Sequence, residues 1–226
     1  MVSKNPFFRA LLLIIAAALA CAPALAQQPD ADKSLNAQMI EFAKRADEKR
    51  VMRLLEAGAN PNTRNRNGET ALYLFAADGK PGTVALLIGR GADVNLATVQ
   101  QTTPLMAASY NGHTEVVKLL IAAGADVHAL DQIEKSALLY AVARGNAQCA
   151  ALLLDQGVAI DARYKHDLTA LMWAAGSGQM DTVKLLLQRG ADATLKDDRG
   201  KTAADMARES GHNEVVVLLD TKTKPN

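Results

Sequence analysis

The chain has 226 residues, with 25 Lys and Arg against 24 Asp and Glu, so its formal net charge is only +1. This balance gives no electrostatic reason to bind nucleic acid or the surface of a membrane. Hydrophobic residues make up 49% of the chain, but no apolar stretch reaches the ~20 residues that cross a bilayer.

Residues 1–26 have the layout of a secretory signal peptide. Two basic residues precede the apolar stretch 10–22, and Ala24 and Ala26 place small residues at −3 and −1 of a cut before Gln27. We therefore expect the leader to be removed, with no membrane insertion afterwards. Because the leader holds two basic and no acidic residues, its removal leaves 23 Lys and Arg against 24 Asp and Glu, a net charge of −1.

The number of cysteines indicates the cellular compartment to which the chain would be exported. Cys21 lies in the leader, so Cys149 alone remains and the exported chain has no intramolecular disulfide. This fits a periplasm better than an animal extracellular space, where small domains are usually cross-linked. An alternative is cleavage ahead of Cys21 with acylation of its thiol, which would make the chain a lipoprotein. We expect Cys149 itself to be a small buried apolar residue rather than a redox sensor.

Residues 27–35 are polar and without periodicity, which predicts a flexible lead-in. The rest of the chain is a tandem array, because leucine recurs every 33 residues, at Leu54, Leu87, Leu120, Leu153, Leu186 and Leu219. Two glycine series share the period: Gly58, Gly91, Gly124, Gly157, Gly190 and Gly79, Gly112, Gly145, Gly178, Gly211. A hydroxyl series does so too: Thr70, Thr103, Ser136, Thr169, Thr202. Such a period indicates units that bury their apolar faces only by stacking.

One unit can be followed through residues 103–127. Thr103 is placed to cap a short helix through its side-chain oxygen, and Gly112 ends that helix. A second helix begins near Thr114, and Gly124 occupies the position where a left-handed residue would end it. Helices of about eight residues are shorter than the ~12–15 that are stable alone, so each unit depends on its neighbours.

The unit is similar to an ankyrin repeat in Thr-Pro-Leu-Met at 103–106, Gly-His-Thr-Glu-Val-Val-Lys-Leu-Leu at 112–120 and Gly-Ala-Asp-Val at 91–94 and 124–127. The resemblance covers roughly residues 36–220 and implies an all-α repeat solenoid. Each unit would be a helix–turn–helix followed by a β-hairpin finger, with a concave face along the stack. It implies about six units of 33 residues including caps, near 36–66, 67–99, 100–132, 133–165, 166–198 and 199–220, before a polar tail at 221–226.

Three places depart from the pattern. In the first unit Ala37 and Ala46 replace the hydroxyl and the glycine, as expected of a terminal unit whose outer face meets water. Val158-Ala159-Ile160 stands where other units have Ala-Asp or Ala-Asn, and Lys80-Pro81-Gly82 occupies one inter-helix turn. We expect local changes of geometry there and no change of fold.

No pattern in the chain indicates catalysis or a metal. Of the four histidines, His113 and His212 follow the repeat glycine and His128 and His166 stand at other positions, and none of the four has metal-ligand spacing. Residues 200–202 are similar to the end of a phosphate-binding loop, but Leu195 stands where that loop needs glycine. We therefore expect a non-catalytic protein without cofactor, although an enzyme remains an alternative.

The helical period predicts where a partner would bind. Residues two, five and six positions after the buried leucine of each first helix share one stripe, which we expect to be exposed on the concave side. Its candidate binding residues are Leu74, Asp78, Tyr110, Asn111, Tyr140, Arg144, Trp173 and Ser177. Trp, Tyr and Arg dominate interface energies. The alternative is that Trp173 and Tyr140 only pack between neighbouring helices.

The finger tips extend this candidate surface, because they vary while the frame repeats. They are Gln100, Gln132, Ile133, Tyr164, Lys165, His166 and Arg199. Similar exported bacterial ankyrin proteins imply a periplasmic scaffold for another protein, accessory to an envelope enzyme such as a catalase in oxidative-stress defence. An immunity protein or accessory that binds a secreted toxin is the alternative.

Overall fold

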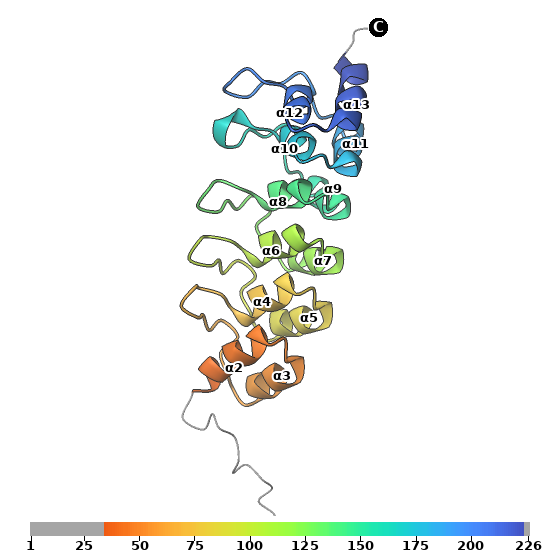
Figure 1. Cartoon of the computed structure of the whole chain (residues 1–226). Helices are drawn as coiled ribbons and strands as arrows, with labels where there is room; N and C mark the ends of the chain where they lie inside the picture. The colour runs from red at the N-terminus through yellow and green to blue at the C-terminus, as the bar shows by residue number, and fades with distance from the viewer. Residues whose placement is uncertain (1–33, 224–226) are drawn as a thin grey trace, which may run out of the picture. The chain divides into compact units, whose positions relative to one another are not determined.

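The computed structural model describes residues 34–223, which form twelve α-helices in six pairs (Figure 1). The pairs are α2 (Leu35–Lys44) with α3 (Glu48–Glu56), α4 (Ala71–Ala77) with α5 (Pro81–Gly89), α6 (Pro104–Asn111) with α7 (Thr114–Ala122), α8 (Ala137–Ala143) with α9 (Ala147–Asp155), α10 (Ala170–Gly176) with α11 (Met180–Gln188), and α12 (Ala203–Glu209) with α13 (Asn213–Thr223). The predicted leader with Cys21 and the cut before Gln27, most of the lead-in and residues 224–226 lie outside this range.

The helices form two layers. The first helix of each pair packs on the first helix of the next, from α2 through α12, and the second helices from α5 through α13 do the same. Figure 1 shows the loops between pairs projecting as fingers beside the layer of first helices. We call the surface made by the first helices and the fingers the inner surface. The all-α repeat solenoid predicted from the sequence is confirmed.

The repeated hydroxyls begin the first helices. The side chain of Thr103 accepts a hydrogen bond from the Met106 N–H, and the four other members of the series accept from the residue three positions ahead in the same way. Each bond satisfies one of the N–H groups that a helix start leaves unpaired. The capping predicted for Thr103 is confirmed and extends to every unit that carries the hydroxyl.

The repeated leucines form the centre of the core. Leu87, Leu120, Leu153, Leu186 and Leu219 are all fully buried. The first member of the series differs, because Leu54 is only half-buried and Leu55 takes the buried position. In the first unit the buried position is therefore shifted by one residue relative to the other units. The last unit is also a terminal one, but its Leu219 keeps the buried repeat position.

The inter-helix glycines are needed where one unit contacts the next. Gly112 adopts φ +76°, and a Cβ added there would lie 2.7 Å from the side-chain oxygen of Asn146 in the following unit. Asn146 donates from Nδ2 to the Ser109 and Tyr110 carbonyls, each at 2.8 Å. His113 lies one unit earlier and donates from Nε2 to the Ala77 carbonyl at 2.9 Å. These side chains thus satisfy the open end of the preceding first helix.

Each finger is closed by backbone hydrogen bonds within a tight turn rather than by paired strands, and one of these bonds spans the base of the turn. The bond runs from the N–H at its base to the carbonyl four residues on, as in Asp131 to Lys135 at 3.0 Å. Residues 34–223 contain no β-strand, so the predicted β-hairpin fingers are hydrogen-bonded turns in this part of the chain. A turn this short leaves no room for a ladder of strand hydrogen bonds.

Backbone hydrogen bonds also join neighbouring finger tips, with one interruption. The N–H groups of Val99, Gln132 and Asp198 donate to the carbonyls of Asn67, Gln100 and His166, at 2.8, 3.1 and 3.2 Å. At the equivalent place, the described residues show no bond from the Lys165 N–H to Ile133. Here His166 and Asp167 have positive φ and the tip forms a 3-10 turn, η1 (Lys165–Asp167).

A second link is missing at the same junction. The side chains of Asn62 and Asn95 accept from the N–H of the aspartate one unit on, Asp93 and Asp126, at 2.8 Å. The next pair in the series is His128 with Ala159, and no such bond joins them in the described chain. The departure noted at residues 158–160 therefore coincides with the interruption of the fingers, and two of the inter-unit links are lost together.

Hydrogen exchange should detect this interruption. We expect the Lys165 amide to exchange at least about tenfold faster than those of Val99, Gln132 and Asp198, because only the latter three are hydrogen-bonded to a neighbouring finger. Amide-resolved exchange measured by NMR tests this, with rates corrected for local sequence. Equal protection of all four amides would show that the fingers are joined continuously.

The finger turns hold one left-handed residue at a fixed repeat position. Glycine occupies it in the first and last fingers, at Gly68 and Gly200, but Gln101, Glu134 and Asp167 occupy it in the middle three, with φ of +62°, +63° and +57°. A non-glycine residue costs roughly 1–2 kcal/mol in this conformation. The middle fingers therefore carry backbone strain that the outer two avoid.

Substitution at this position should change stability in opposite directions. We expect Glu134→Gly to raise the free energy of unfolding by about 0.5–1 kcal/mol, the strain relieved less the added entropy of the unfolded chain. Gly200→Ala should lower it by about 1 kcal/mol, since a Cβ there meets no atom within 4 Å and only φ is strained. Urea unfolding of both variants measures this, and a stabilising Gly200→Ala would contradict it.

Candidate functional site

The aromatic side chains of the inner surface lie in a row. The rings of Tyr110 and Tyr140, from the adjacent helices α6 and α8, meet edge to face with centroids 5.8 Å apart. The Arg144 guanidinium lies over the Tyr110 ring, 4.9 Å from its centroid. Such contacts between cations and ring faces are attractive because the face carries negative charge. The row therefore begins with two tyrosines and an arginine, all predicted from the sequence.

Lys135 connects this part of the row to the chain's one tryptophan. Its ammonium lies 4.5 Å from the ring centroid of Trp173 and 5.9 Å from that of Tyr140. Lys135 belongs to a finger, whereas the two rings belong to α8 and α10. The contact therefore places a finger cation between the aromatic residues of two consecutive units.

A buried carboxylate fixes the central tyrosine. Asp131 accepts the N–H groups of Ile133 and Lys135 through Oδ1, at 3.0 and 2.8 Å, and the hydroxyl of Tyr140 through Oδ2, at 2.5 Å. Burial raises the pKa of the Tyr140 phenol, and the hydrogen bond to Asp131 raises it further. Tyr140 is therefore a neutral donor at physiological pH that ties the finger to α8.

A fourth aromatic residue, Tyr73, belongs to the first helix α4 and is half-buried. The Tyr73 and Tyr110 phenols also raise the pKa of Tyr140, by less than burial and Asp131 do. Burial raises the pKa of Tyr73 itself, and the charge of Glu69 adds to this. We define the aromatic row as Tyr73, Tyr110, Tyr140 and Trp173.

A hollow of about 290 Å³ lies beside the last member of the row. Gly176 contributes no side chain there, although the same repeat position carries Tyr110 in α6 and Glu209 in α12. Its lining combines apolar and polar residues: Leu168, Met172, Trp173, Gly176, Ser177, Arg199, Met206, Glu209 and Ser210. The hollow has the size of a recess for one or a few side chains.

The predicted stripe is only partly exposed. Tyr110 is 41% exposed, and Asp78, Asn111 and Arg144 are also exposed. The other four are half-buried: Leu74, Tyr140, Trp173 and Ser177. The prediction that the whole stripe is exposed was therefore wrong for these residues, because adjacent first helices pack closely enough to cover part of each side chain. Tyr140 and Trp173 pack against the core as well as bordering the surface.

The predicted finger residues are exposed except for Tyr164. Its hydroxyl accepts a 3.0 Å bond from the hydroxyl of Ser136, the residue that caps the first helix of the same unit. Tyr164 also stands at the position where the other four fingers have a side-chain oxygen that accepts backbone N–H groups of the turn, from Asn65, Thr98, Asp131 and Asp197. This replacement removes the acceptor that folds those turns, which accounts for the different shape of its finger.

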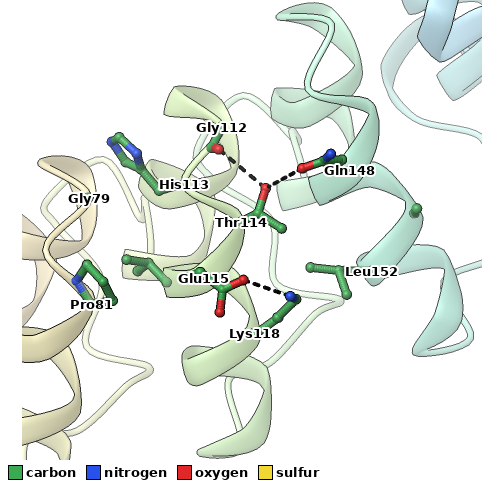
Figure 2. Close-up of a pocket in the computed structure, with 11 residues that line it drawn as sticks. Gly79, Pro81, Gly112, His113, Thr114, Glu115, Lys118, Gln148 and Leu152 are labelled. Carbon is green, nitrogen blue, oxygen red and sulfur yellow. Dashed lines mark hydrogen bonds and ion pairs between the residues drawn. The ribbon is translucent and has the colours of Figure 1, made fainter.

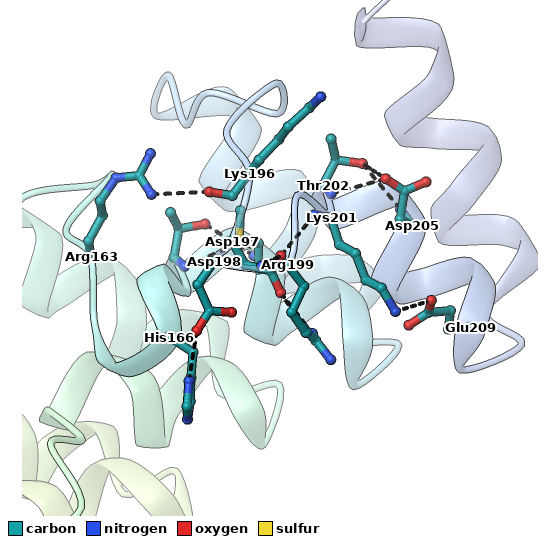
Figure 3. Close-up of polar contacts among 12 residues, drawn as sticks. Arg163, His166, Lys196, Asp197, Asp198, Arg199, Lys201, Thr202, Asp205 and Glu209 are labelled. Atoms are coloured by element: carbon teal, nitrogen blue, oxygen red, sulfur yellow. Dashed lines mark hydrogen bonds and ion pairs between the residues drawn. The ribbon is translucent and has the colours of Figure 1, made fainter.

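Figure 3 shows that two finger residues have internal partners near the last finger. Arg199 donates from Nε to the buried Asp197 carboxylate at 2.8 Å, and His166 lies 2.9 Å from Asp198. Burial raises the pKa of Asp197, but the Lys201 N–H and the Arg199 guanidinium lower it by more, so the net direction is downward. Arg199 therefore supports its own finger, whereas Gln100, Ile133 and Lys165 make no side-chain hydrogen bond or ion pair within residues 34–223.

The outer layer holds a larger but shallow depression of about 720 Å³ among α5, α7 and α9. Figure 2 shows its polar side chains paired with one another, Thr114 with Gly112 and Gln148, and Glu115 with Lys118. Cys149 lies close by, 3.7 Å from the Thr114 hydroxyl, and is buried. Burial raises the pKa of its thiol, which keeps it protonated and unreactive.

Among the described residues, no three His, Cys, Asp or Glu side chains gather in a way that could hold a metal ion. The same residues include no helix of sufficient length and apolar character to span a membrane.

Sequence reasoning missed three residues of this surface. Asp131, Lys135 and Tyr73 were not predicted, although Asp131 and Lys135 fix Tyr140 and Trp173 in place. The available signal was position: Lys135 directly precedes the capping Ser136, at a place where the other units carry Glu69, Thr102, Leu168 and Lys201. Comparing this repeat position between units, where the charge changes, could have identified Lys135.

Comparison with protein families agrees with the repeat geometry. A family model described as ankyrin repeats (3 copies) matches residues 39–131 and 138–226, and one described as ankyrin repeats (many copies) matches residues 112–154. No curated protein is significantly similar to the chain.

Proposed function

Because the chain belongs to the ankyrin-repeat family, whose repeats form protein–protein interaction scaffolds, we propose that it binds another protein through the aromatic row and the cations Lys135 and Arg144. One observation carries this proposal. Both cations lie on aromatic rings, and neither forms an ion pair within residues 34–223. They are therefore available to a partner, and rigid aromatic and cationic side chains are those that dominate interface energies.

The proposal includes export. The basic start, the apolar stretch and the Ala24 and Ala26 positions support a periplasmic scaffold, with acylation at Cys21 as the alternative. The resemblance to exported ankyrin proteins favours a partner such as an envelope catalase, and the alternative partner is a secreted toxin. A catalase or peroxidase gene beside this one supports the first, and a toxic effector gene supports the second.

The leader can be tested directly. We expect the protein from its own host to begin at Gln27 and to occur in the soluble periplasmic fraction. Intact-mass measurement of the purified protein and fractionation by osmotic shock measure both. A lipid-modified N-terminus at Cys21, or the full-length chain retained in the cytoplasm, would contradict periplasmic release.

Photo-crosslinking in the host cell tests the binding surface even while the partner is unidentified. A benzoylphenylalanine at Tyr110 replaces an exposed aromatic residue by another, and the same residue at Lys118 in the outer layer is the matched control. We expect a discrete adduct with a different protein from position 110, identified by mass spectrometry, and none from position 118. Adducts from position 118 alone would place the interface on the outer layer.

A further inference from the structure

Two positions of the repeat change charge along the inner surface. The residue just before the capping hydroxyl is Glu69 in the second unit, neutral in the third and Lys135 in the fourth. The residue six positions after the buried leucine of each first helix follows the same order, with Asp78, then Asn111, then Arg144. Both positions therefore pass from acidic through neutral to basic over three consecutive units.

These four charges are not neutralised within the fold. None of Glu69, Asp78, Lys135 and Arg144 takes part in an ion pair in residues 34–223. Several other basic residues are paired with a carboxylate, as in Lys118 with Glu115 and Lys201 with Glu209. Asp78 and Arg144 are exposed, while Glu69 and Lys135 are half-buried beside the aromatic row.

We propose that the inner surface selects an extended protein segment with separated charges, basic side chains over the second unit and acidic side chains over the fourth, with its middle on Tyr73, Tyr110 and Tyr140. This inference rests on the proposed binding function and adds the chemistry and orientation of the ligand. Complementary charge at both ends fixes register, and a reversed segment meets like charge at both ends.

The packing sets the spacing that such a segment needs. Helices α4 and α8 both pack on α6, and packed helices lie about 8–10 Å apart, which separates the acidic and basic ends by roughly 16–20 Å. An extended chain rises about 3.3 Å per residue, so about five or six residues separate the charged groups of the ligand. The hollow beside Trp173 lies beyond the basic end and can accept an apolar side chain that follows the acidic residues.

Synthetic peptides test the charge order. The probe is a fluorescein-labelled peptide with three aspartates, a neutral spacer containing one tyrosine, and three lysines, and its affinity is measured by fluorescence anisotropy in low-salt buffer. A peptide of the same composition with alternating aspartate and lysine is the control. We expect the separated arrangement to bind at least about tenfold more tightly, with an optimum at a spacer of about five residues.

Charge reversal in the protein provides the decisive comparison. Reversing only the basic end, with Lys135→Glu and Arg144→Glu, should lower the affinity for the peptide with separated charges by at least about tenfold. Reversing the charge of all four residues in one variant should restore this affinity, because the peptide then binds in the opposite direction. The exposed pair alone, Asp78→Arg with Arg144→Asp, repeats the comparison without risk to folding. Exchanging Glu115 and Lys118 on the outer layer should have no effect.

The outcomes separate this inference from the proposed function. Equal affinity for the separated and alternating peptides, absence of binding by both, or failure of the folded four-residue reversal to restore binding overturns the charge order. If crosslinking at Tyr110 still captures a protein partner, the proposed binding surface is retained and only the charge order is rejected. If crosslinking also fails, both proposals are wrong.

Discussion

Replacing Leu120 by alanine is expected to lower the free energy of unfolding by about 2–5 kcal/mol. Leu120 is the α7 member of the repeated leucine series and is 0% exposed, so truncation leaves a cavity between the helices of the third unit. Each unit contacts only its neighbours, and damage in the middle of the stack should separate the two halves. We therefore expect the unfolding transition in urea to broaden as well as to shift.

Two variants control this result. Leu54→Ala affects the same repeat position in the first unit, where the side chain is half-buried, and should cost clearly less. Leu119→Ala truncates the half-buried neighbour in the same helix. A loss of unfolding free energy below about 1 kcal/mol for Leu120→Ala would contradict the central place of Leu120 in the core. Equal losses for Leu54→Ala and Leu120→Ala would contradict the difference in burial between these two residues.

Truncation in the aromatic row is expected to weaken partner binding by about 2 kcal/mol or more for each of Trp173→Ala and Tyr140→Ala. Glu115→Ala and Lys118→Ala in the outer layer should change it by less than about 0.5 kcal/mol. Isothermal titration with the crosslinked partner measures these differences.

The thermal stability of each variant must be measured together with its affinity, because Trp173 and Tyr140 also pack against the core. The Trp173 Nε1 is buried and has no hydrogen-bond partner in the described chain, so Trp173→Phe removes indole area without breaking a hydrogen bond. Tyr140→Phe removes only the bond to Asp131 and keeps the ring. Arg144→Ala removes an exposed cation that lies on the Tyr110 ring. Lost affinity at unchanged melting temperature in Arg144→Ala and Trp173→Phe supports the interface, and retained affinity would move it elsewhere.

Much of the fold could be predicted because its signals are local. A hydroxyl three residues before a free N–H caps a helix wherever it occurs, and a glycine with positive φ ends one. Thr103 and Gly112 therefore predicted their roles independently of any neighbouring unit. The exception at Leu54 lies in one terminal unit only, because Leu219 in the other terminal unit keeps the buried position.

The candidate site was predicted less completely because its geometry depends on contacts between units. Helical phase placed Tyr110, Tyr140 and Trp173 on one stripe, but a stripe does not show how far adjacent helices cover it. The position of Lys135 between two rings depends on the finger fold, which Asp131 fixes from within. The altered finger at Tyr164 likewise depends on a side-chain acceptor that the other fingers have and this one lacks, and only comparison between units reveals it.

The most direct test of the binding surface uses the chain's one tryptophan. Protein labelled with 5-fluorotryptophan has a single ¹⁹F resonance, from Trp173, which lies on the aromatic row. We predict that titration with the crosslinked partner shifts or broadens this resonance and that Arg144→Ala raises the partner concentration needed. A resonance unchanged in position and width at saturating partner would contradict the account.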